Sequence, residues 1–553
     1  EVYPEVYYPL SWSTTAAESD TMFRDSMTES GAFTPADFEG DEGSIAGVYN
    51  GYAYLNLSVS RVMAIRLPGA TVEDVDKSFL GISEAPPHQL EKGHRNLRAS
   101  FNILRYVWRT LGIDGLPELE TDKLRVKEWT ARLPALDAPF DELKAFLQSR
   151  QGFIYALFRQ HLTISGQSAL ALGVLETICR DQLDDASLAL RLVSGLGDVE
   201  SADPSQALWS LGRTVAQDPT LTAHFDQGLD GLADRLRADA AALDVAAFLA
   251  HFDHFLAEFG SRGPNEWEAA CPTWGTDHSL PLALIDRMRC ADPGREPALQ
   301  ISRLAAERSE LTTQARADLN WLQRRIFDKA LRSSQVLAAG RERSKTTIIK
   351  AIHELRLRSY ELADRLAAEH GIDPGDIWFV LQSEIEDYVA EPGAFASTIA
   401  ERRAMRDHLS ELVPPFVFVG SIPPISEWER RPTAAARAED QLAAGEQLVG
   451  ISGAAGKTRG RACVVTDPGQ PGDLGPGDVL VAPLTDPSWT PLFVPAEAVV
   501  VDVGAAMSHA VIVSRELGLP CVVSATDATR RIPHGAMIEV DGSSGTVTVI
   551  ELP

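Results

Sequence analysis

The stretch Val501-Asp-Val-Gly-Ala-Ala-Met-Ser-His-Ala-Val-Ile-Val-Ser-Arg-Glu-Leu-Gly518 decides the fold of the C-terminal part of the chain. An apolar run typical of a buried strand ends at Gly504, where the missing side chain lets the backbone turn closely. Ser508 is a favoured N-cap residue, and Gly518 is a favoured residue just beyond a helix. The pattern therefore predicts a strand, a tight turn and one helix that begins at His509.

The position of His509 suits a residue that carries a phosphoryl group. Unpaired backbone N–H groups and the helix macrodipole favour an anion at the start of a helix. The unperturbed pKa of imidazole is about 6.5, so its neutral form is a competent nucleophile near neutral pH. An isolated Ser-His pair is more often a histidine that only caps or packs, and the surrounding sequence must separate the two interpretations.

The sequence around this stretch alternates between β and α patterns from residue 447 onward. Short Val- and Ile-rich runs bounded by Gly, Pro and Asp predict strands. These runs are GRACVVTD (460–467), GDVLVAPLTD (477–486), AEAVVVDVG (496–504), PCVVSA (520–525), AMIEVDG (536–542) and GTVTVI (545–550). The tetrapeptide Gly542-Ser-Ser-Gly545 predicts a tight hairpin between the last two. Residues 447–553 are thus expected to form a compact β/α domain.

The rest of the chain predicts a different architecture. Residues 1–65 have the pattern of loops with short strands, whereas about 85–412 show apolar residues at three- and four-residue intervals, typical of helices. Residues 414–446, rich first in proline and then in alanine and charge, predict a linker with a short helix. The expected fold is multidomain, with a large mostly α-helical domain over 1–413 and the β/α domain after the linker.

Composition excludes several classes of partner. The 553 residues carry 51 basic and 78 acidic side chains, a net charge of −27. Nucleic acids and anionic membranes both require basic clusters, so neither is an expected partner. No apolar run approaches the roughly 20 residues of a membrane span, and the N-terminus lacks the pattern of a signal peptide. The five scattered cysteines fit a reducing cytoplasm, which is the expected location.

The C-terminal sequence resembles the phosphohistidine swivelling domain of the PEP-utilising enzymes, among them phosphoenolpyruvate synthase, pyruvate phosphate dikinase and rifampin phosphotransferase. The residues that carry the resemblance are Gly504, Ser508, His509, Ala510, Arg515, Gly518 and Pro520, with Ala505 where a second glycine is common. The resemblance implies that His509 accepts a phosphoryl group with support from Gly504, Ser508 and Arg515. Six helical residues rotate a side chain by about 600°, so structural pairing or contact with a partner domain suits Arg515 better than phosphate contact.

Much of residues 1–435 is similar, more loosely, to the central domain of rifampin phosphotransferase and related enzymes that phosphorylate antibiotics or phenols. The segments that carry this similarity are VYPEVYYPLSWS (2–13), GYAYLN (51–56), FGSRGPNE (259–266) with Pro272 and Trp274, GRERSK (340–345) and GIDPGDIWF (371–379). The family often has a histidine where this chain has Ser261, which removes any acid/base role tied to that position. The similarity implies an acceptor site that includes Arg262, Glu266, Trp12 and Tyr54.

Several of these residues also have a structural interpretation. Arg341 and Lys345 are four apart, so on a helix they share a face and could clamp a phosphoryl group or form a solvated basic stripe. Arg262 and Glu266 flank Gly263-Pro264 in a loop, where they could line a pocket or form an internal ion pair. Trp12 and Tyr54 belong to a group of aromatic residues that could wall an apolar pocket or pack in a core.

Two further motifs are discounted. The segment Ser452-Gly-Ala-Ala-Gly-Lys-Thr458 looks like a phosphate-binding loop, but Ile451 stands where the P-loop needs its first glycine. His251 and His254 share a helix face without a third ligand, so no metal site is expected.

The resemblance implies a dikinase-type phosphotransferase that needs ATP and Mg²⁺. The phosphoenolpyruvate-binding barrel and the ATP-grasp domain of the family have no counterpart in these patterns. ATP is therefore expected on a separate ATP-grasp subunit or on a domain missing from this sequence. His509 would carry the phosphoryl group to a hydroxyl of a small hydrophobic acceptor such as a phenol, leaving AMP and phosphate. The alternatives are a phosphocarrier or regulatory module without an acceptor, a phosphoenolpyruvate synthase-like component, and an enzyme that phosphorylates only to activate a later condensation or dehydration.

Overall fold

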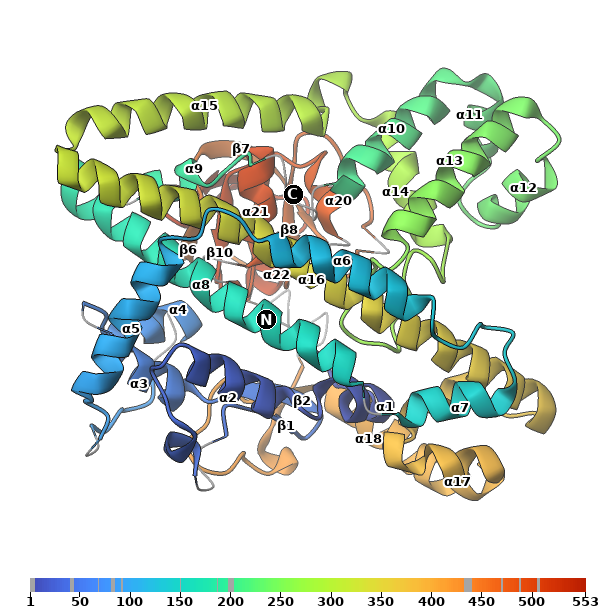
Figure 1. Cartoon of the computed structure of the whole chain (residues 1–553). Helices are drawn as coiled ribbons and strands as arrows, with labels where there is room; N and C mark the ends of the chain where they lie inside the picture. Colours follow the sequence, from blue (N-terminus) through green and yellow to red (C-terminus); the bar gives the residue numbers. More distant parts are fainter. Residues whose placement is uncertain are drawn as a thin grey trace.

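The computed structural model describes residues 5–39, 44–67, 69–80, 85–90, 93–149, 151–185, 187–196, 203–431, 440–468, 471–486, 489–504 and 508–553. Within these ranges the chain forms a large helical region followed by a C-terminal region built on a β-sheet (Figure 1). The expected fold class is therefore confirmed. The short helix expected in the linker falls largely on 432–439, outside the described residues.

Two long helices, α8 (Gly152–Leu183) and α16 (Trp321–His370), run side by side through the helical region (Figure 1). The ends of α16 are set by its sequence. Asn320 accepts hydrogen bonds from the first-turn N–H groups in a capping box, and Gly371 ends the helix in the left-handed conformation with a φ of 67°. With 50 residues, α16 reaches from one end of the region to the other.

The remaining helices pack around this pair. Those before α8 are α1 (Pro9–Ser11), α2 (Ser19–Glu29), α3 (Leu57–Arg66), α4 (Val72–Leu80), α5 (Leu97–Thr110), α6 (Pro117–Thr130) and α7 (Phe140–Gln148). Those between α8 and α16 are α9 (Leu188–Leu192), α10 (Asp203–Gln217), α11 (Pro219–Asp226), α12 (Leu232–Ala238), α13 (Leu243–Phe259), α14 (Ser279–Cys290) and α15 (Pro297–Asp318). The last are α17 (Ile385–Ala390) and α18 (Ala396–Ser410).

The N-terminal segment differs partly from its expected pattern. The hairpin of β1 (Ala46–Tyr49) and β2 (Tyr52–Leu55) confirms the short strands expected in its second half. Loop and strand were also expected elsewhere in residues 1–65, but α2 and most of α3 fall there. The start of the segment likewise forms α1 and the π-helical turn η1 (Trp12–Ala16). Pro9 explains the difference, because proline favours the first position of a helix even within a β-branched and aromatic sequence. A second small hairpin pairs β3 (Leu412–Val413) with β4 (Glu429–Arg430).

One segment passes a length and composition test for a membrane span. Residues 140–183, which include α8, are long and apolar enough, and about a third of their most apolar window is buried inside the protein. Core helices of globular proteins pass the same test. In this chain α8 packs against α16, α2 and α5.

The C-terminal sheet has eight strands in the order β5-β12-β11-β7-β8-β9-β10-β6. The central strands β7, β8, β9 and β10 run parallel, and antiparallel strands complete both sides. The strands are β5 (Gln447–Val449), β6 (Ile451–Ala454), β7 (Lys457–Val464), β8 (Asp478–Ala482), β9 (Ala498–Val501), β10 (Cys521–Val523), β11 (Met537–Asp541) and β12 (Thr546–Glu551). Strands β8, β9 and β10 are buried throughout, as parallel strands covered on both faces should be. The expected hairpin at 542–545 joins β11 to β12.

Within the described part of this region, three helices accompany the sheet: α20 (Thr490–Phe493), α21 (His509–Leu517) and α22 (Ala528–Arg531). One sheet face packs with α22, and the other packs with α20 and α21. The discounted phosphate-loop lookalike forms β6, a turn and the start of β7, and no helix follows it. It therefore lacks the strand-to-helix geometry of a P-loop.

A single apolar cluster spans both regions of the protein. Trp209 of α10 and Met288 of α14 belong to the same buried cluster as Leu492 and Phe493 of α20. All four side chains are at most 3% exposed. The helical region and the sheet region are therefore packed against each other through a hydrophobic contact, and this contact brings the start of α21 to the helical region (Figure 1).

Candidate functional site at the start of α21

The sequence around His509 folds as its pattern predicts. Strand β9 leads to Gly504, and α21 begins at His509 and ends at Gly518, which has a left-handed φ of 68°. A Cβ atom on Gly504 would lie 2.9 Å from the Cβ of Val523, so only glycine fits this turn. Ser508 occupies the N-cap position, but its side chain makes no capping hydrogen bond and is buried without a partner among the described residues. Residues 505–507 lie outside the described ranges.

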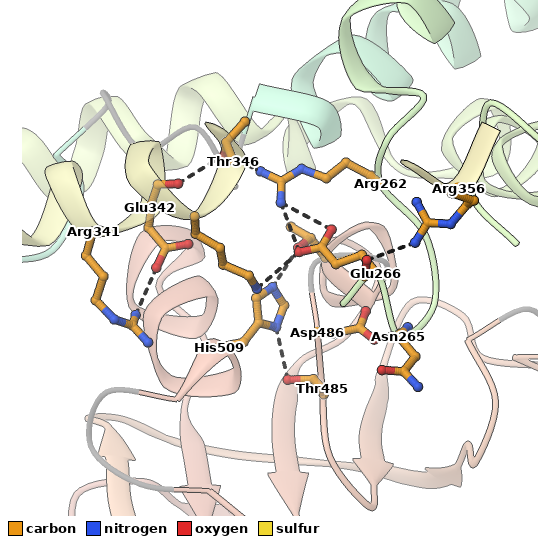
Figure 2. A network of polar contacts seen from close by, with 12 residues as sticks. Arg262, Asn265, Glu266, Arg341, Glu342, Thr346, Arg356, Thr485, Asp486 and His509 are labelled. Carbon is orange, nitrogen blue, oxygen red and sulfur yellow. Dashed lines mark hydrogen bonds and ion pairs between the residues drawn. The ribbon is translucent and has the colours of Figure 1, made fainter. Parts of the chain in front are cut away.

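Two threonine hydroxyls hold the imidazole ring of His509 at both nitrogens. Nε2 lies 3.0 Å from Oγ1 of Thr490, and Nδ1 lies 3.1 Å from Oγ1 of Thr485. The ring also meets Phe493 edge to face, with ring centroids 5.9 Å apart. A neutral imidazole has one donor and one acceptor nitrogen, and hydroxyl groups satisfy either role. Figure 2 shows the ring between Thr485 below and the side chains of the helical region above.

Three cations of the helical region surround this histidine. Burial holds the pKa of His509 well below 6.5, and Lys345, Arg262 and Arg341 lower that pKa further. The ring is therefore neutral at pH 7, which leaves a lone pair for nucleophilic attack. A phosphoryl group on the ring would bring negative charge to the same cations, so the site repels a protonated histidine and attracts a phosphorylated one.

The buried carboxylate of Glu266 pairs with two of these cations, Arg262 and Lys345. Glu266 is completely buried; Nη1 of Arg262 lies 3.1 and 3.2 Å from its two oxygens, and Nζ of Lys345 lies 3.1 Å from Oε1. Burial acts to raise the pKa of Glu266, but Arg262 and Lys345 together hold it below its usual value. Nη2 of Arg262 also donates to Oγ1 of Thr346 at 2.6 Å. The two cations are thus held at fixed positions (Figure 2).

Arg356 of α16 holds the loop that carries Arg262 and Glu266 through hydrogen bonds to its backbone. This guanidinium is fully buried and donates to the backbone carbonyls of Glu266, Glu268 and Ala269 at 3.0–3.1 Å. A Cβ on Gly263 would lie 2.7 Å from the backbone of Pro272 and Thr273, so the loop has no room for a side chain there.

The expectation that Arg341 and Lys345 share a helix face toward a common site agrees with their shared effect on His509. Nη1 of Arg341 donates to Oε1 of Glu342 at 2.9 Å, and Arg341 keeps about a quarter of its side chain exposed. Lys345 is 14% exposed. Neither residue lies on a fully solvated stripe, which was the competing interpretation of the spacing.

Polar contacts position the C-terminal region against the helical one. The backbone N–H of Asn265 donates to Oδ2 of Asp486 at 2.8 Å, directly beside the histidine site (Figure 2). Farther away, Arg287 of α14 donates to the backbone carbonyls of Leu474 and Gly472, each at 2.9 Å. These contacts, together with the apolar cluster, hold His509 at the cations.

Arg515 lies elsewhere on α21. Its Nε donates to the carbonyl of Gly453 in β6 at 3.1 Å, burial lowers its pKa to about 10, and the Glu176 carboxylate of α8 acts in the opposite direction. Arg515 also lines a small cavity between α8, α16 and α21 together with Ser168 and Ser334. Six residues of helical rotation account for this placement, and the structure does not bring Arg515 to the imidazole as a phosphoryl-stabilising group.

The predicted aromatic acceptor residues also lie apart from His509. The hydroxyl of Tyr54 donates to the carbonyl of Pro415 at 2.9 Å, and its ring packs against Tyr49 and Phe418. Trp12 begins η1 and is 37% exposed. Tyr54 is therefore part of a packed aromatic cluster with the 415–418 segment, which was the alternative interpretation of these residues.

The sequence patterns do not single out Thr485, Thr490, Asp486 and Arg356 as site residues. The two threonines stand at the ends of the segment TDPSWT (485–490), where nothing local distinguishes them from turn residues. His251 and His254 are exposed on α13, and the residues that the structure describes contain no group of three or more metal-binding side chains. The absence of a metal site therefore stays a prediction.

Sequence models of two protein families match the chain. Residues 160–342 match the fourth domain of rifampicin phosphotransferase. Residues 474–545 match the mobile domain of PEP-utilising enzymes. The first match contains Arg262, Glu266 and Arg341, and the second contains His509. Residues of both matched regions therefore meet in the candidate site.

Curated relatives extend over both regions. An uncharacterized protein of Mycobacterium tuberculosis (strain ATCC 25618 / H37Rv) is 31% identical over 481 residues, which cover 85% of this chain and 50% of that protein. The prodigiosin synthesizing transferase PigC of Serratia marcescens is 29% identical over 536 residues, covering 92% and 58%. The rifampicin phosphotransferase of Streptomyces sviceus is 29% identical over 305 residues, covering 54% and 34%. The chain spans about half the length of the first of these relatives.

The sheet region, with its histidine at a helix start, is a mobile domain of the type found in PEP-utilising enzymes. Residues 474–545 therefore match the PEP-utilising enzyme family through its mobile domain, and the helical region is similar to that of the proteins named rifampicin phosphotransferase.

Proposed function

We propose that this chain carries the phosphohistidine and the acceptor site of an ATP-dependent phosphotransferase of the dikinase type. A phosphoryl group from ATP is placed on His509 and then passed to a hydroxyl of a small hydrophobic acceptor, for which a phenol is the model. AMP and phosphate are the other products. The observation that carries the proposal is the placement of Arg262, Arg341 and Lys345 of the helical region around the neutral ring of His509.

The residues present suit the second half of this reaction. The acceptor oxygen attacks phosphorus, the P–N bond to His509 breaks, and its electron pair returns to the ring nitrogen. Arg262, Arg341 and Lys345 balance the charge of the phosphoryl group in transit. Their effect on the His509 pKa also favours a leaving imidazole that is not protonated. Docking against the helical region excludes water, which would otherwise compete with the acceptor.

ATP and Mg²⁺ belong to the first half of the reaction. We propose that an ATP-grasp unit binds them, either as a separate subunit or as another part of a longer protein. Bound there, ATP and Mg²⁺ supply the phosphoryl group. Threonine hydroxyls at both ring nitrogens orient His509, and its position at the start of α21 favours the negative charge it receives.

The test separates charging from transfer. The chain is treated with phosphoramidate, a small-molecule phosphoryl donor to histidine, and the modified residue is located by mass spectrometry in wild type and His509→Ala. The wild type is expected to carry one phosphoryl group on His509 and to pass it to phenol, catechol or 2-naphthol. Adding an ATP-grasp partner and labelled ATP should give the same product with AMP. Phosphorylation that persists in His509→Ala would overturn the proposal, as would an aryl phosphate formed without His509.

A second candidate differs in the fate of the product. The relative named prodigiosin synthesizing transferase covers 92% of this chain, more than the rifampicin phosphotransferase does. Because that name describes a synthesis, the second candidate is a reaction in which phosphorylation activates the acceptor for a later bond-forming step. Product analysis distinguishes the two, because a simple phosphotransferase accumulates the phosphate ester and an activating enzyme releases inorganic phosphate with a condensed product.

A further inference from the structure

A second histidine, His161 of α8, reaches the same cations from the helical region. Its side chain is 8% exposed, and Nδ1 lies 2.9 Å from Oγ of Ser344 on α16. Ser344 directly precedes Lys345 and lies three residues after Arg341. The His161 ring is therefore placed beside the helix turn that supplies two of the three cations around His509.

The hydrogen bonds around Ser344 favour one tautomer of His161. Oγ of Ser344 donates its single hydrogen to the backbone carbonyl of Arg341 at 2.9 Å. With its hydrogen directed to that carbonyl, the hydroxyl accepts from the imidazole, so we assign the ring hydrogen to Nδ1. Nε2 of the neutral ring then holds the lone pair, and the hydrogen bond to Ser344 is at the other ring nitrogen.

Aromatic contacts connect His161 to the buried carboxylate of the site. The His161 ring lies 6.2 Å from the ring of Trp267 and 6.4 Å from that of Phe158, measured between centroids. Nζ of Lys345 lies 5.7 Å from the Trp267 ring centroid, and Trp267 directly follows Glu266 in the loop. His161, Trp267 and Lys345 thus lie next to one another, and the rings of His161, Trp267 and Phe158 together form an aromatic wall.

We propose that His161 is the base that removes the proton from the acceptor hydroxyl. This inference rests on the proposed function of the site. As the acceptor oxygen bonds to phosphorus, its proton passes to Nε2 of His161. The P–N bond breaks at the same time, and its electron pair returns to His509. No further oxidant, reductant or co-reactant is required. The wall formed with Trp267 and Phe158 would face the apolar body of an aromatic alcohol.

Electrostatics make this base responsive to the phosphoryl group. Burial, with the positive charges of Arg341 and Lys345, lowers the pKa of His161 to about 3, and a backbone hydrogen bond with Arg341 acts in the opposite direction. In the site without phosphate, His161 is therefore a weak base. A phosphoryl group bound to Arg341 and Lys345 offsets their positive charge, and this offset raises the basicity of His161 when transfer is to occur.

The experiment uses the whole chain, phosphorylated on His509 with phosphoramidate and freed of the donor. Loss of phosphate from His509 is followed by ³¹P NMR with phenol, catechol or 2-naphthol present, and with water alone, from pH 5 to 9. The variant His161→Asn retains a side-chain N–H for Ser344 but has no basic nitrogen, and His161→Gln offers a second geometry. The control His224→Asn changes a histidine on α11 that pairs with Asp239 at 3.0 Å, outside the site.

Both His161 variants should accept the phosphoryl group as the wild type does, and should lose it to the fastest of these acceptors at least about 100-fold more slowly. The dependence of the transfer rate on pH should flatten in both, and His224→Asn should match the wild type. Equal rates of loss in wild type and His161→Asn for every acceptor, water included, would overturn the inference. Failure of the wild type to form phospho-His509 would instead overturn the proposed function, so the two failures are distinguishable.

Discussion

Nζ of Lys345 and Oε1 of Glu266 lie 3.1 Å apart, although one belongs to the long helix α16 and the other to a loop 79 residues earlier in the chain. The carboxylate is completely buried and is shared with Arg262. A charge in such a position is stable only when its partners stay in place. This pair therefore couples the position of the loop to the position of the cations that face His509.

The first prediction concerns Lys345. Replacing it with methionine keeps the length of the side chain and removes the charge, so transfer of phosphate from His509 to the acceptor should slow by about 10²- to 10³-fold. Phosphorylation of His509 by phosphoramidate should be retained. The control Lys350→Met lies on the same helix and removes an ion pair with Glu258, where both side chains are at least one third exposed. Equal transfer rates in the two variants would contradict a role for the Lys345 charge.

The second prediction concerns stability. Glu266→Gln removes the negative charge between Arg262 and Lys345, which leaves two buried cations without their carboxylate. Breaking such a buried pair should lower the free energy of unfolding by about 3–5 kcal/mol, measured by urea denaturation at pH 7. The matched variant Glu384→Gln weakens an ion pair with Arg402 that is about one quarter exposed, and should cost less than about 1 kcal/mol. An equal decrease in the free energy of unfolding in both variants would show that the buried ion pair of Glu266 stabilises the protein no more than the partly exposed pair of Glu384.

The third prediction is a dependence of docking on pH. The pKa of His509 is lowered in the docked arrangement by burial and by Lys345, Arg262 and Arg341, whereas an exposed histidine has a pKa near 6.5. Protonation therefore favours the undocked arrangement. Docking should be complete above pH 7 and weaken as the pH falls below 6.5, seen as a larger radius of gyration in X-ray scattering.

The variant His509→Gln provides the control for this effect, because glutamine does not titrate. Its radius of gyration should stay constant over pH 5–7, apart from changes that the wild type shares. Phosphorylation of His509 should act in the opposite direction to acid, because it adds negative charge beside the three cations. A wild type whose dimensions follow those of His509→Gln at every pH would refute the prediction.

The fourth prediction concerns the loop that carries Arg262. A Cβ on Gly263 would meet the backbone of Pro272 and Thr273 at 2.7 Å, and backbone cannot move aside as a flexible side chain can. Gly263→Ala should therefore displace Arg262 and Glu266, slow transfer at least about 10-fold and lower the melting temperature by several degrees. In contrast, a Cβ on Gly173 of α8 meets nothing within 4 Å, so Gly173→Ala should leave transfer unchanged and stabilise the helix by up to about 1 kcal/mol.

The C-terminal region shows how far local sequence can predict structure. The helix from His509 to Leu517 has the predicted bounds because its N-cap, apolar spacing and terminal glycine all agree. Strands β5 and β6 were missed as strands. The sequence of β6 is small and glycine-containing, and its partner β10 is distant in the chain, so sheet pairing rather than local preference makes it a strand.

The candidate site was predictable where charge and motif coincide, as at His509, Arg341 and Lys345. The contacts of Thr485 and Thr490 with His509 depend on the parallel sheet, which brings the loop after β8 next to the helix after β9. Arg356 could not be identified either, because a buried arginine that holds carbonyl groups looks like any charged residue in a helical sequence.

The apolar cluster shared by α10, α14 and α20 has a consequence for the movement of the carrier. If His509 travels between a charging site and this one, Leu492 and Phe493 must leave Trp209 and Met288 on every cycle. Exposing these four side chains to water would cost free energy in each crossing. Movement of the domain would therefore exchange one hydrophobic interface for another. We expect the unit that charges His509 to offer an apolar surface that buries Leu492 and Phe493 in turn.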